Sequence, residues 1–411
     1  MPPTADTGAP GPASPTPMPP GSRGALALCC LVGLLDGLDA QMVALALPIL
    51  APDLAAEPAD FGIVLAAGLS GIMLGSIACG PLADRFGRRA LIVATTVLFG
   101  AFTLLTAGAG SVGELAVLRF LTGLGLGGAL PNIAALAADL APRHRRAAAV
   151  TLVYAGFPAG AVAGALIGAW LIPALGWRAA FVLGGVAPLA LAPVLAVRLP
   201  RAKTAPEGGA GSVLGILAPR WRGMTLALWA SGFLAMAVLF FLLSWLPSLL
   251  HGSGLAFRDA AFATAALSAG GMVGGVAVGL LVDRWGPARP IGGAYLLLGV
   301  ALLGFGPAMA SPATLIPMAL AAGLLANAGV IGVGALAALA YPPAVRSSGV
   351  GWTLGVGRLG SIAAPLAGGV LVAQGWGTAA IFSSYAVPCA LAGLAVAAAG
   401  RAARRAAGGA D

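Results

Sequence analysis

The chain of 411 residues is 59% hydrophobic and only 9% charged, with a mean hydropathy of +0.98. It has too few polar side chains to cover the surface of a water-soluble protein, so the composition indicates an integral membrane protein. The formal net charge of +9 does not indicate a nucleic-acid-binding protein, because the Arg residues form short clusters between apolar runs and no basic face with aromatic neighbours is present.

The beginning of the chain differs from the rest, since residues 1–22 contain eight prolines and predict a disordered tail. Apolar runs of roughly 20 residues, the length that crosses about 30 Å of hydrocarbon, then predict an all-α membrane fold of twelve transmembrane helices. The longest polar interruption divides these helices into two six-helix halves, 23–200 and 222–400, joined by a linker at 201–221 and followed by a tail at 401–411. The expected helices are 24–48, 60–82, 89–109, 112–138, 146–171, 178–198, 222–248, 259–282, 290–309, 313–339, 347–372 and 377–400.

The first predicted helix carries two carboxylates, Asp36 and Asp39, in the middle of an apolar run. A spacing of three residues places both side chains on one face of a helix. An ionisable side chain at bilayer depth costs about 2.5 kcal/mol or more on insertion scales, so the pair is expected to face protein or water. The pattern favours a proton or substrate site. The structural alternative is a pair that only hydrogen-bonds to neighbouring helices.

A short sequence at the end of the second predicted helix recurs in the second half of the chain. GPLADRFG at 80–87 reappears as GLLVDRWG at 279–286, a displacement of 199 residues. Pro142 and Arg146 recur as Pro342 and Arg346, and the Gly-Trp pair at 176–177 recurs at 375–376. Three matches at nearly one displacement indicate two halves built from the same unit, an arrangement in which transporters place their substrate site between the halves.

The repeated loop also predicts a gate between the two halves. Gly87 allows a tight turn, and Asp84 is expected to accept hydrogen bonds from the N-terminus of a helix across the seam between the halves. In the second copy, Pro287 and Ala288 replace the basic pair Arg88 and Arg89. The expected gating residues are Gly80, Asp84, Arg85, Gly87, Arg88, Arg89, Asp283 and Arg284.

The distribution of basic residues predicts the orientation in the membrane. Of the 22 Lys and Arg, 18 fall in the two tails and in alternate connections, and only Arg178 and Arg258 fall in the opposite set. Positively charged connections remain on the cytoplasmic side, so both termini are expected to be cytoplasmic. We expect a multi-pass protein of a bacterial inner membrane.

Several of these motifs resemble those of a known family. GPLADRFGRRALIV at 80–93 and RFLTGLGLGG at 119–128 resemble the signature loop and the fourth-helix motif of the major facilitator superfamily. Within it, DGLD at 36–39 is similar to the Asp-Gly-aromatic-Asp element of the aromatic acid/proton symporters, with Leu38 at the aromatic position. PNIAAL, YAGFP, WLP and GVGRLG are similar to the 3-(3-hydroxyphenyl)propionate transporter branch.

The resemblance implies secondary active transport by alternating access. The expected cargo is a small aromatic carboxylate of the hydroxyphenylpropionate or hydroxybenzoate type, imported together with protons. The resemblance implies that the proton gradient supplies the energy for transport, and no cofactor or metal is expected. The expected partners are the aromatic acid, protons and membrane lipid, without nucleic acid, and the protein is expected to be a monomer.

Two Arg residues, Arg119 and Arg358, lie inside predicted helices. Arg358 lies about 11 residues into its helix, roughly 17 Å at 1.5 Å per residue, which is near the middle of the membrane. A guanidinium keeps its proton there and needs a negative partner. We expect Arg358 to bind the substrate carboxylate while Asp36 and Asp39 carry the coupled protons. A permanent salt bridge from Arg358 to one aspartate is the alternative. Arg119 is also a candidate substrate-binding residue. It is expected to be shallower and to reach outer water, and a structural role is the alternative.

Other residues are candidates for the substrate site or for moving parts. Asn132 is a further substrate candidate, and Pro131 beside it is expected to interrupt the fourth helix. Glycines at every fourth position, at 156–168 and at 271–279, predict closely packed helices that slide. The aromatic side chains available to flank a substrate ring, or alternatively to pack between helices, are Tyr154, Phe157, Trp229, Phe233, Trp245 and Trp352.

Three other classes of function are alternatives to import of an aromatic acid. A drug-efflux antiporter of the same fold favours cationic substrates, and two intramembrane Arg residues argue against it. A sugar or organic-acid uniporter shows no pH dependence. A membrane enzyme needs a nucleophile and base or metal ligands at depth, but both histidines, His144 and His251, fall in predicted loops. The sequence therefore predicts a protein that is not an enzyme.

Overall fold

The computed structural model describes residues 22–142, 145–200, 216–342 and 345–408, and the regular structure in these ranges is helical. The predicted tail at 1–22 and most of the predicted linker at 201–221 lie outside the described residues. The first half contains α1 (Ser22–Leu50), α2 (Pro58–Phe86), α3 (Arg88–Thr106), α4 (Val112–Leu140), α5 (Arg146–Leu175) and α6 (Trp177–Arg198). The second half contains α8 (Pro219–Gly252), α9 (Phe257–Trp285), α10 (Ala288–Leu303), α11 (Phe305–Ala308), α12 (Pro312–Ala340), α13 (Arg346–Ala373), α14 (Thr378–Ser384) and α15 (Ala386–Gly408).

The predicted twelve-span, all-helical class is confirmed. Among the described residues, 11 helical segments are long and apolar enough to cross a membrane, and the shorter apolar α10 supplies the ninth span of the predicted series. The ninth and twelfth spans are interrupted, between α10 and α11 and between α14 and α15. Pro307 and Pro388 explain both positions, because proline has no N–H that could donate a helical hydrogen bond to the carbonyl four residues earlier. Those carbonyls belong to Leu303 and Ser384, the last residues of α10 and α14.

One predicted interruption is wrong. α4 runs without a break from Val112 to Leu140 and contains Pro131. The side-chain amide of Asn132 donates a hydrogen bond of 2.7 Å to the carbonyl of Gly128, one turn earlier in the same helix. Neighbouring helices surround this part of α4, so the helix continues despite the proline.

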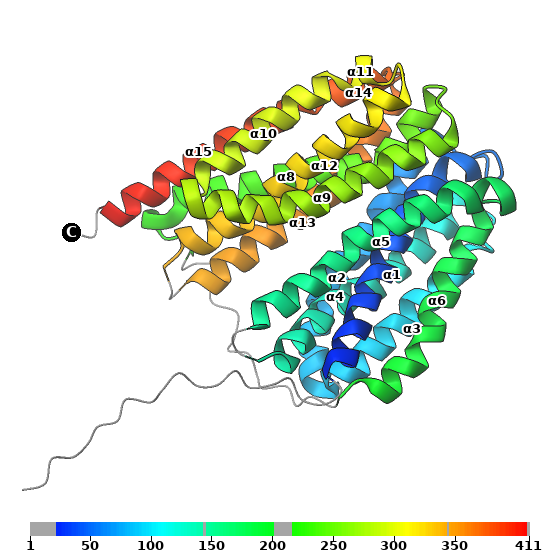
Figure 1. The fold of residues 1–411 in the computed structure, drawn as a ribbon, viewed down its shortest axis with the longest axis horizontal. Coiled ribbons are helices and arrows are strands. Elements are labelled where there is room, and N and C mark those ends of the chain that lie inside the picture. Colours follow the sequence, from blue (N-terminus) through cyan, green and yellow to red (C-terminus); the bar gives the residue numbers. More distant parts are fainter. Residues whose placement is uncertain (1–21, 143–144, 201–215, 343–344, 409–411) are drawn as a thin grey trace, which may run out of the picture.

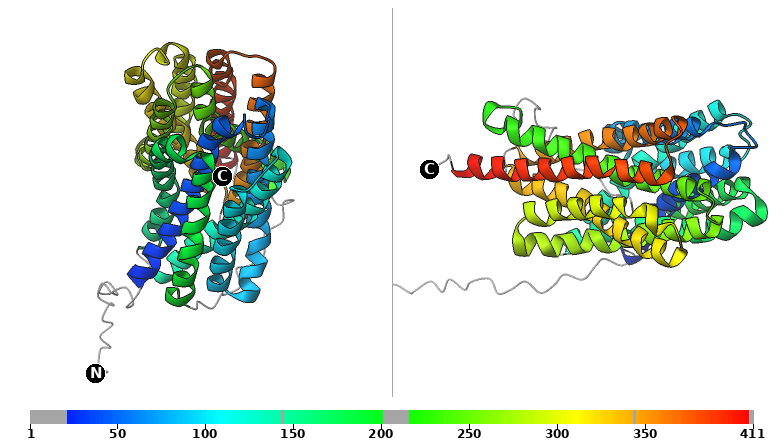
Figure 2. Two further views of the ribbon diagram at one scale, coloured as in Figure 1. Left: turned by 90° about the vertical axis from the view of Figure 1, so that its right-hand side faces the viewer. Right: turned by 90° about the horizontal axis from the view of Figure 1, so that it is seen from above.

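The two halves form separate helix bundles that meet at one end and diverge at the other (Figure 1). The end at which they diverge carries Ser22 of α1 and the C-terminal part of α15, and we call it the terminal end (Figure 2). The end at which they meet carries α11 and α14, and we call it the distal end (Figure 1). The helices of the two halves therefore spread apart toward the terminal end (Figure 1).

The predicted internal repeat appears in the turns of the backbone. Gly87 and Gly286 adopt φ values of +85° and +73°, and both follow the repeated loop motif. Gly176 and Gly375 adopt φ values of +80° and +76° before the repeated tryptophan. A side chain is strained in this conformation, which explains why glycine stands at these positions.

The same repeat appears in the packing within each half. α1 packs on α5 and α2 on α4, and the corresponding pairs in the second half are α8 with α13 and α9 with α12. A Cβ at Gly160 would overlap the backbone carbonyl of Leu34, and a Cβ at Gly360 would overlap that of Phe233. Gly360 lies 200 residues after Gly160. Each half is therefore held together by backbone contacts that admit no side chain at these glycines.

The predicted glycine face is confirmed on α5, where Gly156 and Gly160 touch the backbone of α1. On α9, the predicted Gly271 and Gly275 also lie against α12, through the side chains of Asn327 and Ile331, but Gly279 has no neighbour within 4 Å. The closest backbone contacts with α12 are made by Gly270 and Gly274, one residue earlier. Adjacent glycines at 270–271 and 274–275 offer two faces with the same spacing, about 100° apart, so spacing alone does not distinguish them.

Replacing Gly160 by Ala is expected to destabilise the protein by about 1–3 kcal/mol, because the added methyl group has to push α1 away from α5. The measurement is thermal unfolding of the purified protein in detergent. Gly355→Ala is the matched control, since Gly355 also lies within a helix and nothing would lie within 4 Å of its added Cβ. Equal unfolding temperatures for the two variants would contradict the close α1–α5 contact.

At the distal end the two halves touch through backbone as well as side chains. A Cβ at Gly62 of α2 would lie 2.7 Å from the carbonyl oxygen of Pro365 in α13, and one at Gly369 would lie 3.1 Å from that of Ala59. We call these contacts the glycine seam. Nearby, the guanidinium of Arg258 lies 3.7 Å from the ring centre of Trp170, which joins α9 to α5. The two halves are therefore in close contact at the distal end.

Candidate functional site

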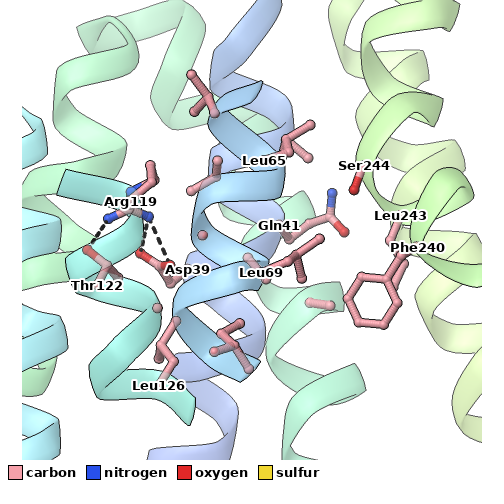
Figure 3. A pocket seen from close by; sticks show the side chains of 18 of the residues that line it. Asp39, Gln41, Leu65, Leu69, Arg119, Thr122, Leu126, Phe240, Leu243 and Ser244 are labelled. Atoms are coloured by element: carbon pink, nitrogen blue, oxygen red, sulfur yellow. Dashed lines mark hydrogen bonds and ion pairs between the residues drawn. The ribbon is translucent and has the colours of Figure 1, made fainter. Parts of the chain in front are cut away.

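A buried ion pair joins Asp39 of α1 to Arg119 of α4 (Figure 3). Nη1 of Arg119 donates to both carboxylate oxygens of Asp39, at 3.2 and 3.0 Å. The hydroxyl of Thr103 donates to the same carboxylate at 2.9 Å. Both charged side chains are 4% exposed. The expectation that Arg119 reaches outer water is therefore wrong in this conformation, because the guanidinium turns inward to the negative charge of Asp39.

Three hydroxyl groups complete the surroundings of this guanidinium. Nη2 of Arg119 donates to Thr103, Thr106 and Thr122, at 3.0, 3.2 and 2.8 Å. The charge also lies 5.3 Å from the ring centre of Phe181. Nε of Arg119 is buried without a hydrogen-bond partner among the described residues. A buried pair of this kind depends on both charges, since removal of one leaves the other without compensation.

The ion pair lies in the wall of a cavity between the two halves, which contains about 680 Å³ of empty space. α1, α2, α4 and α5 line it from the first half, and α8 lines it from the second. Most of the wall is apolar, with the rings of Phe157 and Phe240 among its side chains. A mostly apolar cavity with a few polar groups is typical of a small-molecule binding site.

Gln41 and Ser244 add polar groups to this cavity from opposite halves. In Figure 3 the side chain of Gln41 extends from α1 toward Ser244 and Phe240 of α8. Gln41 is 2% exposed, and its Nε2 has no hydrogen-bond partner among the described residues. A buried amide without a partner is unfavourable, so this group is available to a polar atom of a ligand.

A second group of candidate residues lies nearer the terminal end. Asp36 precedes Asp39 by about one turn of α1, roughly 4.5 Å along the helix axis. Arg358 lies within electrostatic reach of Asp36 and of Tyr154, although no hydrogen bond or ion pair joins it to either residue in the described part of the chain. The structure therefore does not contain the alternative salt bridge between Arg358 and an aspartate. Asp36 is 7% exposed and Tyr154 is 47% exposed.

The predicted aromatic side chains divide into three groups. Phe157 lines the cavity, and the rings of Trp229 and Trp352 lie 6.0 Å apart on α8 and α13. Trp245 is 1% exposed, and its indole N–H donates to the carbonyl of Pro365 at 3.1 Å, so it packs between helices at the glycine seam. Two further candidates do not line the cavity: Phe233 has its carbonyl against Gly360, and Asn132 bonds within α4.

The predicted gating residues lie at the terminal end, where the halves are apart. Arg88 forms an ion pair with Asp139, which ties the start of α3 to the end of α4 within the first half. The guanidinium groups of Arg85 and Arg284 lie over the neighbouring rings of Phe86 and Trp285. Asp283 is exposed, Arg89 is half-buried, and a Cβ at Gly80 would have no neighbour within 4 Å. The side chain of Asp84 lies outside the described part of the structure.

Some residues of the site were not predicted from the sequence. Thr122 lies three residues after Arg119 and so shares its face of α4. Thr103 and Thr106 are also three residues apart and share one face of α3. Hydroxyl groups at this spacing are a sequence signal for a partner of a buried charge. Gln41 and Ser244 are single polar residues in apolar helices. No local pattern distinguishes them, because their importance comes from the way α1 and α8 meet.

Two bundles of related structure that enclose a mostly apolar cavity with a buried ion pair in its wall are typical of a membrane transporter. The sequence profile of the Major Facilitator Superfamily matches residues 29–323. The chain is 36% identical to a 4-hydroxybenzoate transporter of Pseudomonas aeruginosa over 90% of each chain. It is 34% identical to a gallate transporter of Pseudomonas putida, over 93% of this chain and 92% of the relative. It is also 36% identical to a 3-(3-hydroxyphenyl)propionate transporter of Escherichia coli, over 90% and 92%. This chain belongs to the major facilitator superfamily, in the group that contains these aromatic acid transporters.

Solved structures agree with this fold. A bacterial homologue of the human lysosomal transporter Spinster, in an inward-facing and unoccupied conformation, has a TM-score of 0.75 at 19% identity, covering 94% of this chain and 98% of that chain. A D-xylose–proton symporter has a TM-score of 0.73 at 19% identity, covering 90% and 95%. The sequence-based recognition of the family is therefore confirmed.

Proposed function

We propose that this protein imports a small aromatic carboxylate together with protons through a bacterial inner membrane, with both termini in the cytoplasm. The observation that carries the proposal is the cavity between the halves, in which a buried carboxylate–guanidinium pair lies beside aromatic rings and an unpartnered amide. The names of the relatives support the aromatic acid as the cargo. In this orientation the terminal end is cytoplasmic, and the conformation described above is open to the inside.

In the proposed cycle, Asp39 and Asp36 carry the protons. Protonation of Asp39 removes the negative partner of Arg119, whose guanidinium then depends on the three threonine hydroxyl groups and on the incoming anion. Arg358 binds the substrate carboxylate, since it has no bonded partner in the described part of the chain and lies within electrostatic reach of Asp36. Release of the anion inward allows Asp39 to lose its proton and to pair with Arg119 again.

The aromatic ring of the substrate is proposed to lie between Phe157 and Phe240. A ring hydroxyl group then accepts from Nε2 of Gln41 and bonds to Ser244, which joins the two halves through the substrate. Tyr154, Trp229 and Trp352 are proposed to line its path from the terminal end. The glycine seam and the Arg258–Trp170 contact have to separate when the transporter opens outward.

Uptake into proteoliposomes tests the proposal. With an acidic exterior, radiolabelled 4-hydroxybenzoate or 3-(3-hydroxyphenyl)propionate is expected to accumulate inside, and a protonophore is expected to abolish the accumulation, because the substrate moves with protons. 4-Hydroxybenzyl alcohol, which keeps the ring and its hydroxyl but lacks the carboxylate, is the control substrate and is expected not to accumulate. Uptake that is independent of the pH gradient would contradict the proposed coupling.

A further inference from the structure

A second cavity, remote from the transport site, lies at the terminal end of the second half. It contains about 670 Å³ of empty space between the end of α9, the start of α10, the end of α12 and the last turns of α15. Arg289 and Arg404 contribute the charges of its wall, and Leu336, Leu339 and Trp285 contribute apolar groups. We call it the basic pocket.

The internal repeat explains why this pocket exists. In the first half, the ion pair between Arg88 and Asp139 closes the corresponding corner between α3 and α4. The equivalent positions, 199 and 200 residues later, are Pro287 and Leu339, which form no ion pair. The second half therefore lacks both charges of this ion pair. Pro287 and Leu339, which stand in their places, line the pocket.

The charges of the basic pocket are available to a ligand. Arg289 and Arg404 are exposed, and neither has a hydrogen bond or ion pair with another described residue. The nearest acidic residue along the chain, Asp283, is not part of the wall. Two guanidinium groups without carboxylate partners favour an anion with several oxygen atoms, and phosphate oxygens fit the fork of an Arg side chain.

The apolar part of the pocket distinguishes a lipid from a free anion. Leu339 is 65% exposed and Trp285 is 52% exposed, although both adjoin the charged wall. Trp and Arg at the end of a membrane-spanning helix occupy the head-group region of a bilayer. Basic pockets between such helices bind acidic phospholipids.

We propose that the basic pocket binds the phosphate head group of an anionic phospholipid, with Arg289 and Arg404 on the phosphate and the acyl chains along Leu339 and Trp285. The bound lipid bridges the start of α10 and the end of α15. It takes the place that the Arg88–Asp139 ion pair holds in the first half.

Thermal unfolding of the full chain in detergent tests this site, with dioleoyl-phosphatidylglycerol as the probe. The anionic lipid is expected to raise the unfolding midpoint by about 2–4 °C at saturation. Dioleoyl-phosphatidylcholine and inorganic phosphate are expected to give no shift. The shift is expected to disappear in the double variant Arg289→Gln/Arg404→Gln. It is expected to remain in Arg401→Gln/Arg405→Gln, which loses the same charge from exposed residues outside the wall.

Fluorescence provides a second measurement that does not depend on the stability of the variants. Phosphatidylglycerol with brominated acyl chains, in a phosphatidylcholine bilayer, is expected to quench Trp285 more than brominated phosphatidylcholine does. The emission assigned to Trp285 is obtained by comparison with Trp285→Phe. Equal quenching by the two lipids, or an equal loss of the thermal shift in both double variants, would overturn the proposal. A shift with inorganic phosphate alone would replace the lipid by a free anion and also overturn it.

Discussion

Replacing Asp39 by Asn is expected to abolish net proton-driven uptake and to leave counterflow exchange of labelled substrate in place. The amide cannot gain or lose the coupled proton, whereas exchange requires only that loaded transporters reorient. The variant is also expected to be less stable by about 3–5 kcal/mol, because the Arg119 guanidinium stays buried without its negative partner. Uptake, counterflow and thermal unfolding are measured on the same proteoliposome and detergent preparations.

Two further variants serve as controls for Asp39→Asn. Asp53→Asn alters a carboxylate that is half exposed at the distal end, where it bonds to Trp177 and Arg178, and uptake is expected to remain. The double variant Asp39→Asn/Arg119→Gln removes both charges of the buried pair, so it is expected to recover stability without recovering net uptake. Proton-driven accumulation by Asp39→Asn would show that the coupled proton is carried elsewhere.

Replacing Arg358 by Gln is expected to raise the apparent KM for an aromatic carboxylate by about 30- to 150-fold. That factor corresponds to about 2–3 kcal/mol, which lies in the upper part of the range of about 1.5–3 kcal/mol for a hydrogen bond to a charged group. Arg358→Lys is expected to fall between the wild type and Arg358→Gln, because an ammonium group keeps the charge but not the paired donors of a guanidinium. Initial rates of uptake over a range of substrate concentrations measure the effect.

The specificity of this effect for the carboxylate has its own test. The methyl ester of the substrate, added as a competitor, is expected to bind wild type and Arg358→Gln equally, because it has no negative charge for Arg358 to hold. Arg178→Gln removes an Arg that is half exposed at the distal end and is expected to leave KM unchanged. If the ester and the acid lost affinity together, Arg358 would act on the shape of the site rather than on the carboxylate.

The fold followed from the sequence because its signals are long and repeated. Apolar runs gave the spans, and a displacement of 199 residues gave the two halves, which the turns at Gly87 and Gly286 share in the structure. The breaks at Gly304 and Tyr385 are not apparent from the sequence, because both spans are continuous apolar runs despite Pro307 and Pro388. Pro131 predicts a break that does not occur, because neighbouring helices pack around α4 and the helix continues.

The site was predictable in its charges but not in its pairing. Sequence spacing placed Asp36 and Asp39 on one face, and mid-membrane depth identified Arg358. Spacing along one helix does not say which other helix lies opposite, so the partner of Asp39 was not recognised as Arg119 of α4. Trp245 shows the same difficulty, because its burial at the glycine seam depends on contact between α8 and α13.

The glycine seam has a consequence for how the transporter opens. Its contacts are backbone carbonyl oxygens lying against glycines. Separating them therefore breaks no hydrogen bond and leaves no buried charge without a partner. This part of the distal contact is therefore expected to respond little to acidity or ionic strength. In the proposed cycle, sensitivity to the proton gradient comes from Asp36 and Asp39, and the glycine seam separates when the two bundles move apart at the distal end.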